Sequence, residues 1–489
     1  MEYLSLLCHL FIIGLSVVLP LYTGGTYWQL GDTKYFLFRN MAFLCVGIWL
    51  AVQIVMQIIN IIRRRKVKLS TMDVWMLCYG AATGLSALLS HYGATAWLGY
   101  NEWYMGGLTQ LLFVGIYFFV SRSYDGAKYS LLLGEAAIFI VMAIGFCHRL
   151  GLDPTGLLAG YGPMNWEYSH MLSTIGNINW FCGYCSVAMV FPLAGCLKGE
   201  KKWEWMPAYV VSVMCLALLM VQGSDTGILV AAACLFVCLI LGVNDGKLLK
   251  RTIALGTGTC FWLQIYGLLV RLLGDSAVDA IPVDGFCRKL AGWNGWWAIG
   301  LAGLLLYVWL DRLYRQDRQQ TVKRVAVTLP AFVAIAGVAG VLVFSFGGSF
   351  EGGWGNGRGA LWSLTLQGFW QNGFLQKLFG VGPDCFAEYI YSVFLTEKMP
   401  ELGGRWAGTI FANAHNEWLN QLLNLGIVGV GCYLGIFVTG LRRYRKYLPG
   451  LLALILYGVV SMTGFQQVLS TPYLFLVLGL SESVRKSKV

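Results

Sequence analysis

The stretch "LLNLGIVGVGCYLGIFVTGLRRYRKYLPGLLALILYGVVSM", residues 422–462, decides how the chain folds. Two apolar runs flank a basic cluster that extends from Arg442 to Lys446. Each run belongs to an apolar segment long enough to cross a hydrocarbon core of about 30 Å as a helix. Because basic residues concentrate in cytoplasmic loops, the pattern predicts two membrane-spanning helices that are joined on the cytoplasmic side.

The same alternation of apolar run and basic cluster repeats along the whole sequence. It predicts an all-α integral membrane protein with about 14 spans, within a range of 12 to 14. The predicted spans are residues 3–22, 36–62, 72–90, 105–121, 129–147, 180–197, 205–222, 226–243, 252–273, 294–310, 325–346, 415–440, 449–466 and 469–482. Pairs of spans separate the basic clusters, so an even number of spans and two cytoplasmic termini are expected.

The composition agrees with this class of protein. Of the 489 residues, 57% are hydrophobic and 12% are charged, against roughly 25% charged in soluble domains. The net charge of +11 is explained by cytoplasmic loops and does not call for a nucleic-acid partner. The 14 cysteines lie mostly in apolar runs, where a thiol acts as a small hydrophobic group. Residues 1–489 are therefore predicted to form one membrane domain surrounded by membrane lipids. No cofactor is expected.

The segment 347–414 is the long extracytoplasmic loop of this scheme. It is rich in Gly, Trp and charge in a chain that is otherwise poor in charge. Long loops in compact proteins usually carry function. Apolar residues within 360–370 recur at three- and four-residue spacings, which predicts an interfacial helix on the membrane surface.

A polar block opens the predicted span at 415–440. Its side chains recur at intervals of three and four residues, which places them on one helix face. They are Asn413, Asn416, Glu417, Asn420 and Asn424. In lipid such a stripe must face protein or water, so it lines a cavity or forms interhelical hydrogen bonds. His415 lies at its outer mouth, where a neutral imidazole accepts a proton; a lone histidine is also often structural.

Several outer basic residues are candidates for binding one anion. Arg358 follows the glycine-rich run "GGSFEGGWGNG", and Arg405 shares its loop. Arg271 and Arg288 flank the preceding outer loop. Arginine binds phosphate and carboxylate oxygens in a bidentate manner, so these residues are expected to converge on one anion, and Arg358 is well placed to meet a lipid diphosphate. Anchoring to lipid headgroups is the alternative reading for each of them.

Three segments together resemble the O-antigen ligase and polymerase superfamily. They are "GRGALW", "LFGVGPDCF" and "NAHNEWLNQLLNLGIVG", and the resemblance is concentrated in residues 347–440. The segment "STIGNINWFCGYC" is similar to the Gly-Asn-x-Asn segment of that family, which adds Asn177.

The resemblance implies a membrane glycosyltransferase fold in the cytoplasmic membrane of a bacterium, with its active site facing outward. The implied reaction moves a glycan from an undecaprenyl diphosphate carrier to an acceptor hydroxyl of a glycan or lipid-glycan, with inversion and without a metal ion. By position, His415 would be the general base, Arg358 the arginine that holds the diphosphate, and Asn416 a supporting residue.

The chain departs from the family pattern at "QGSDTG", residues 222–227. Family members often carry Ser-Arg where this chain has Ser224 and Asp225. The expectation is that Arg271, Arg288 or Arg405 supplies the missing positive charge, while Asp225 orients an arginine or contacts the acceptor.

Two other functions fit the same topology. A flippase for lipid-linked oligosaccharides, or another secondary transporter, also combines many spans with cavity charges. A non-catalytic scaffold would leave the clustered polar residues incidental. The histidine motif at the end of the long outer loop favours the transferase. The residues do not distinguish polymerisation of repeat units from ligation of a finished chain.

Overall fold

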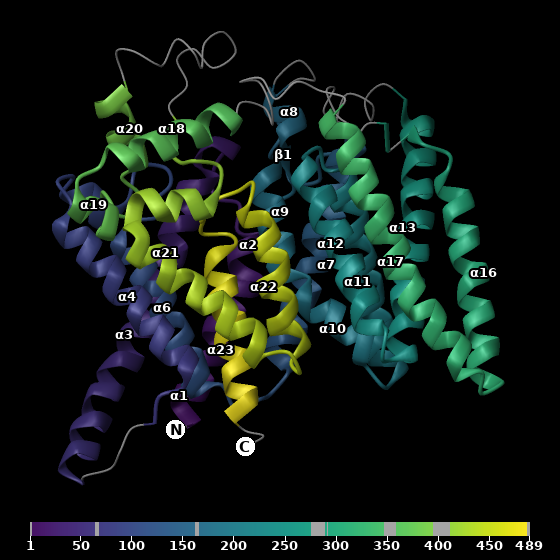
Figure 1. Ribbon diagram of the computed structural model, residues 1–489, viewed down its shortest axis with the longest axis horizontal. Helices are drawn as coiled ribbons and strands as arrows, with labels where there is room; N and C mark the ends of the chain where they lie inside the picture. Colours follow the sequence, from purple (N-terminus) through teal and green to yellow (C-terminus); the bar gives the residue numbers. More distant parts are fainter. Residues whose placement is uncertain are drawn as a thin grey trace. The chain divides into compact units, whose positions relative to one another are not determined.

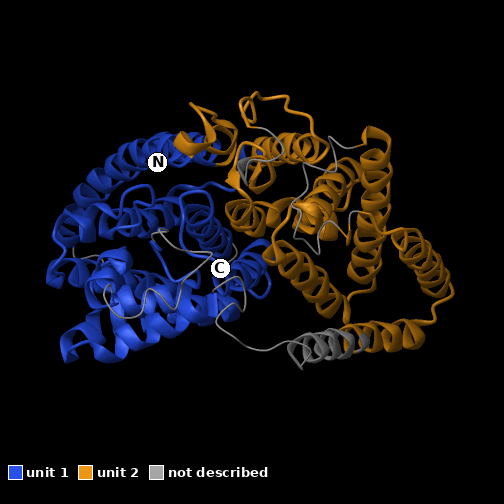
Figure 2. Ribbon diagram, turned by 90° about the horizontal axis from the view of Figure 1, so that it is seen from above, with its two compact units in different colours: residues 1–15, 31–130, 349–489 blue, residues 16–30, 131–348 orange. Residues whose placement is uncertain are grey.

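The structure of the protein is a computed structural model that describes residues 2–63, 68–161, 166–274, 289–290, 292–346, 358–394 and 411–486. These residues are almost entirely helical, with one two-residue strand pair (Figure 1). The chain divides into two compact units, which Figure 2 colours separately. Unit 1 comprises residues 1–15, 31–130 and 349–489, and unit 2 comprises residues 16–30 and 131–348.

Unit 1 contains both ends of the chain and the region that the sequence analysis singled out. Its elements are α1 (Glu2–Ile13), most of α3 (Tyr27–Ile62), α4 (Thr71–Leu89), α5 (Ala94–Leu98), α6 (Gly107–Ser123), α18 (Arg358–Gln371), α19 (Phe374–Phe379), α20 (Phe386–Phe394), α21 (Glu417–Arg443), α22 (Leu448–Ser461) and α23 (Thr471–Lys486). A short π-helical turn, Gly14–Val18, and α2 (Leu19–Leu21) follow α1 in the chain, and their residues from Ser16 onward belong to unit 2.

Unit 2 contains the middle of the chain. Its elements are α7 (Tyr129–Arg149), α8 (Trp166–His170), β1 (Met171–Leu172), β2 (Gly176–Asn177), α9 (Ile178–Ala188), α10 (Val190–Lys198), α11 (Lys202–Val221), α12 (Asp225–Gly242), α13 (Gly246–Leu273), α16 (Trp296–Arg315) and α17 (Gln319–Phe346). The two strands pair antiparallel, with Met171 opposite Asn177.

Ten helical segments among the described residues are long and apolar enough to cross a membrane, and α22 is a shorter apolar helix. Large apolar side chains on these helices point outward: Leu44 is 63% exposed, Ile61 75% and Leu272 73%. A water-soluble protein does not expose so much apolar surface, whereas lipid tails cover it without cost. The chain is therefore an all-α, multi-pass membrane protein. The count of fourteen spans and the single domain stay predictions.

Inside unit 1, aromatic rings fill the space between the long helices. Phe113 of α6 stacks on Phe475 of α23 at 5.6 Å, and Tyr79 of α4 lies 5.3 Å from Tyr433 of α21. Offset aromatic pairs of this kind contribute about 0.5–1.5 kcal/mol beyond the burial of their area. Tyr79 also stacks on Phe475 at 6.4 Å, so aromatic contacts connect α4, α6, α21 and α23.

The predicted helix at 360–370 is present as α18. Together with α19 and α20 it lies at one end of the long helices of unit 1 (Figure 1). Its apolar side chains Leu361 and Leu364 pack into a cluster with Phe386 and Ile390 of α20. The same cluster includes Leu423 of α21, so these short helices are fixed against the segment that begins with the histidine motif.

Candidate functional site

His415 lies in a tight turn immediately before α21. Its backbone has φ of 46°, in the left-handed region that a side chain with a Cβ rarely adopts. The carbonyl oxygen of the Asn413 side chain accepts a hydrogen bond from the His415 backbone N–H at 3.0 Å. The Asn420 side chain accepts one from the N–H of Ala414 at 3.3 Å. Such strain, held by surrounding contacts, is typical of functional positions.

Asn416 is the N-cap of α21. Its side-chain oxygen accepts a hydrogen bond from the backbone N–H of Leu419 at 3.1 Å, and its side-chain nitrogen donates to the carbonyl of Met462 at 3.1 Å. An asparagine cap stabilises a helix start by about 1 kcal/mol. The motif "NAHNEWLN" therefore shapes the turn as well as the helix, because three of its asparagines hold the backbone on either side of His415.

The His415 imidazole is half-buried and lies edge-to-face on Phe465, with 5.3 Å between the ring centroids. Burial, with the positive charge of nearby Arg358 as the second cause, lowers the pKa of His415 from its ordinary 6.5 to about 4. The ring is therefore neutral at physiological pH. A neutral imidazole can accept a proton, which is the property that a general base requires.

Arg358 is the first residue of α18 and is half-buried. Among the predicted diphosphate ligands in the described part of the chain, Arg358 is the one whose charge acts on the pKa of His415. Arg405 and Arg288 lie outside the described residues. Arg271 belongs to unit 2, where its guanidinium donates to the carbonyl of Gly292 at 3.0 Å and also to Asn294.

Glu417, although adjacent to His415 in sequence, points into the helix bundle. Its carboxylate accepts hydrogen bonds from the hydroxyl groups of Tyr433, Tyr457 and Ser461, at 2.9 Å for Tyr457 and 3.4 Å for Ser461. A buried acidic group is tolerated where several hydrogen-bond donors surround it. The placement makes Glu417 a structural connection between α21 and α22 near the histidine turn.

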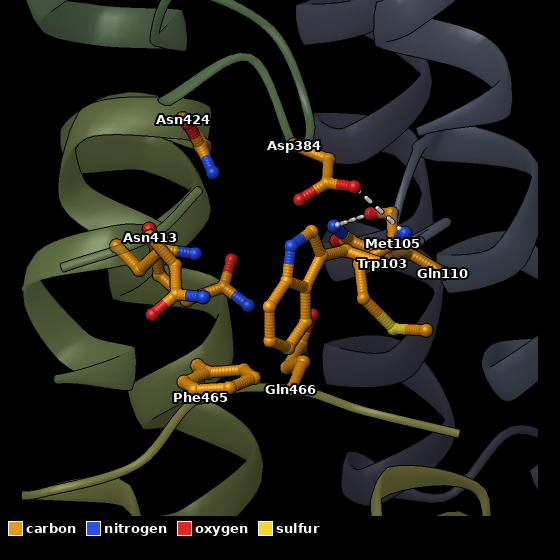
Figure 3. Close-up of a pocket in the computed structure, with 10 residues that line it drawn as sticks. Trp103, Met105, Gln110, Asp384, Asn413, Asn424, Phe465 and Gln466 are labelled. Carbon is orange, nitrogen blue, oxygen red and sulfur yellow. Dashed lines mark hydrogen bonds between the residues drawn. The ribbon is translucent and has the colours of Figure 1, made fainter. Parts of the chain in front are cut away.

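A pocket adjoins the histidine turn in unit 1 (Figure 3). Its lining comes from segments that are far apart in the sequence, and most of the side chains are amides or aromatic rings. They are Trp103, Met105, Gln110, Asp384, Asn413, Asn420, Gln421, Asn424, Phe465 and Gln466. Of the predicted polar stripe, the structure thus brings Asn413, Asn420 and Asn424 to one cavity near His415.

One wall of the pocket depends on a break in α21. Gly426 has φ of 69° and interrupts the helix, so the carbonyl groups just before it are free to pair with other partners. The backbone N–H of Val381 donates to the carbonyl of Leu423, and that of Gly382 donates to the carbonyl of Asn424, both at 3.0 Å. The segments "LFGVGPDCF" and "NLGIVG" are therefore bonded to each other through their backbones.

Asp384 connects this wall to the loop between α5 and α6. One carboxylate oxygen accepts hydrogen bonds from the backbone N–H groups of Tyr100 and Met105, each at 2.8 Å. Burial raises the pKa of Asp384 from 3.8 to about 7, although both N–H groups act to lower it. Helix α5 is bonded to α20, because the Thr95 hydroxyl donates to Glu388 at 2.8 Å.

The predicted site residues of unit 2 form a group of their own. Asn177 caps α9, since its side-chain oxygen accepts from the Asn179 N–H at 2.8 Å. The hydroxyl of Ser224 donates to the side chain of Asn179 at 2.7 Å, so the segments "GNIN" and "QGSD" meet within this unit. Asp225 is the exposed first residue of α12. A fully buried arginine lies at the same corner: Arg149 donates to the carbonyl groups of Gln222 and Ser169.

Sequence reasoning gave no role to several lining residues of the pocket. Trp103 and Gln110 belong to the α5–α6 region, and Phe465 and Gln466 follow α22. Asp384 lies inside a segment that carried the family resemblance, which was the one available signal for it. In the described ranges, no group of three or more His, Cys, Asp or Glu side chains is arranged to hold a metal ion.

The fold and the pocket define an all-α membrane protein with a polar site at the start of a broken helix. Comparison with protein-family models gave no match, and neither did comparison with curated proteins.

Proposed function

We propose that the protein is a metal-independent, inverting glycan transferase that uses an undecaprenyl-diphosphate-linked saccharide as donor. The product would be a cell-surface polysaccharide, made either by polymerisation of repeat units or by ligation as in O-antigen ligases, at the outer face of a bacterial cytoplasmic membrane. The observation that carries the proposal is His415, a neutral imidazole in a strained turn beside a positively charged arginine.

The chemistry that such a site supports is a direct displacement. The acceptor hydroxyl attacks the anomeric carbon of the donor sugar and loses its proton to the imidazole of His415. The bond between that carbon and the diphosphate oxygen breaks, and its electron pair leaves with the diphosphate. Arg358 offsets the charge of the diphosphate, which is already a good leaving group. Attack from the face opposite the leaving group inverts the anomeric configuration.

The proposal rests on Arg358 among the four arginines that the sequence singled out. Arg271 belongs to unit 2, and Arg288 and Arg405 lie outside the described residues, so their contribution to diphosphate binding stays a prediction. A double variant, Arg288→Ala with Arg405→Ala, tests it. We expect its KM for the donor to rise by about tenfold or more, since a charged hydrogen bond contributes about 1.5–3 kcal/mol. Unchanged kinetics would remove both from the site.

Reconstitution of the purified protein in liposomes with one defined undecaprenyl-diphosphate-linked oligosaccharide tests the function itself. Transfer predicts release of undecaprenyl diphosphate with growth of the saccharide: a ladder of lengths indicates polymerisation, and a single step onto an added acceptor indicates ligation. Movement of the intact donor between leaflets, with no release of diphosphate, would instead assign a lipid-linked oligosaccharide flippase and overturn the proposal.

The pH dependence of kcat/KM reports the pKa of the base in the free enzyme. With a pKa of about 4, His415 loses its proton-accepting form only as the pH falls through that value. We expect kcat/KM to stay level from pH 8 to about pH 5 and to fall below it, whereas an ordinary histidine would lose activity below pH 6.5. Rates measured from pH 4 to 8 check this.

The Arg358→Gln variant tests whether the positive charge of Arg358 lowers the pKa of His415. Loss of the positive charge removes one of the two causes that lower the pKa of His415, so the fall of kcat/KM at low pH should move to higher pH. The maximal rate should also fall, because the diphosphate loses its proposed partner. His91→Ala serves as the control, because removal of this exposed histidine in the turn after α4 should leave the pH profile unchanged. If the pH at which kcat/KM falls is the same in Arg358→Gln as in the wild type, His415 is not the titrating base.

A further inference from the structure

The pocket beside the histidine turn shares residues with it. Asn413 lines the pocket and also accepts the hydrogen bond from the His415 backbone. Phe465 lies edge-to-face with both His415 and Trp103, at 5.3 and 4.8 Å between centroids. A molecule in this pocket therefore contacts two residues that also contact His415.

The asparagines of the pocket present nitrogen atoms as hydrogen-bond donors. Asn413 and Asn420 use their side-chain oxygens to accept backbone N–H groups of the turn, which leaves their NH₂ groups for the pocket. The nitrogen of Asn424 is also turned toward the pocket in Figure 3, so this side chain adds a third amide donor to the lining.

The charge of the lining selects the kind of ligand. Asp384 is the one charged side chain among the described residues that line the pocket, and it is acidic. A phosphate or carboxylate would meet this acidic group, and a bare cation would meet the NH₂ groups of three asparagines. A neutral molecule that both donates and accepts hydrogen bonds satisfies the amides and the carboxyl group together.

The shape of the pocket adds a second restriction. The water-sized space inside it amounts to about 10 Å³, which is room for about one water molecule or one hydroxyl group. A sugar can therefore place one hydroxyl group in the pocket while its ring stays outside, at the open side. The rings of Trp103 and Phe465 offer apolar surface beside the amides. Sugars combine these features, because they carry hydroxyl groups on their edges and C–H groups on their faces.

We propose that this pocket binds one hydroxyl group of the acceptor sugar, among the asparagines and Asp384, while the C–H face of the sugar lies against Trp103. This assignment rests on the proposed transferase function. It places the acceptor sugar against Asn413 and Phe465, which also contact His415, and it makes Asn424 and Trp103 residues that determine acceptor binding.

Binding is measured without turnover by saturation-transfer difference NMR on the full chain in nanodiscs, which avoids sugar-based detergents. The probes are free glucose, galactose, N-acetylglucosamine and rhamnose, each tested alone, with inorganic phosphate as a competitor. We expect at least one sugar to bind and phosphate not to displace it. Asn424→Leu should weaken binding by about two- to tenfold, the effect of one lost hydrogen bond. Trp103→Leu should abolish the signal.

Asn372→Leu is the matched control, because Asn372 is a similarly buried asparagine of unit 1 that does not line the pocket. It should leave sugar binding unchanged. Asn424→Leu is expected to keep the thermal unfolding temperature of the wild type, since it removes an amide whose oxygen has no partner among the described residues. Loss of binding in a variant that stays folded therefore reports the contact with the sugar.

The proposal is overturned if no sugar binds the wild type, if phosphate displaces the sugar, or if Asn372→Leu and Asn424→Leu weaken binding equally. The reconstituted transfer assay separates this failure from failure of the proposed function. Transfer with no sugar bound in the pocket would refute the acceptor site alone. Sugar binding that depends on Asn424, with no transfer by the wild type, would refute the transferase alone.

Discussion

The His415→Asn variant is expected to lose turnover of the lipid-linked donor by about 10²–10⁴-fold, the usual contribution of a positioned general base. Asparagine suits this test better than alanine because it tolerates the left-handed backbone at φ of 46°. The turn should therefore persist while the proton acceptor is lost. The measurement is the initial rate of undecaprenyl diphosphate release in liposomes at equal protein content.

His91, an exposed histidine in the loop after α4, supplies the control. His91→Ala should keep the rate of the wild type. A further variant, His415→Gly, should be as inactive as His415→Asn. It should unfold at a higher temperature than His415→Asn, since glycine adopts positive φ without strain. A His415→Asn enzyme that retains more than half of the wild-type rate would exclude His415 as the base.

Gly426→Ala is expected to destabilise unit 1 by about 3 kcal/mol or more, through positive φ and collision with a neighbouring backbone. A Cβ at this position would meet the backbone of Leu378 and lie 2.6 Å from the nitrogen of Gly380. The segment 378–382 would have to move away from α21, and the two backbone hydrogen bonds that form the pocket wall would be lost. Thermal unfolding of the purified protein in detergent measures the effect.

Gly431→Ala is the matched control in the same helix, because a Cβ there would meet no atom within 4 Å. Alanine in a helix interior is favoured over glycine by about 0.5–1 kcal/mol, so this variant should be as stable as the wild type or more stable. Equal stability of the two variants would contradict the close contact between α21 and the 378–382 segment.

The sequence was sufficient to predict the class of fold, because apolar runs and basic clusters are local signals. Helices occupy all of the predicted spans, and α18 begins at Arg358, two residues before the predicted interfacial helix. The break in α21 was not predicted. An apolar stretch with several glycines fits a continuous helix equally well, and only the approach of a distant backbone requires Gly426 to leave the helical conformation.

The polar stripe was predicted on one helix face, and the structure divides it. Asn413 and Asn416 precede the helix and hold the histidine turn, while Glu417 faces Tyr433 and Tyr457 in the bundle. Three- and four-residue spacing places side chains on one face only within a helix. Here the helix begins at Glu417, so the spacing does not apply to the residues before it. Trp103 and Asp384 could not be assigned to the site from the sequence. Trp103 lies about three hundred residues before the histidine turn, and no local pattern links either residue to that turn.

The contact between Gly380 and α21 also has a mechanical consequence. With no side chain between the two backbones, the segment 380–382 and the helix start after His415 form one stiff body. The loop of residues 99–105 is bonded to the same wall, because Asp384 accepts hydrogen bonds from the backbone N–H groups of Tyr100 and Met105. Under the proposed transferase function, the base would therefore keep one position from one transfer to the next.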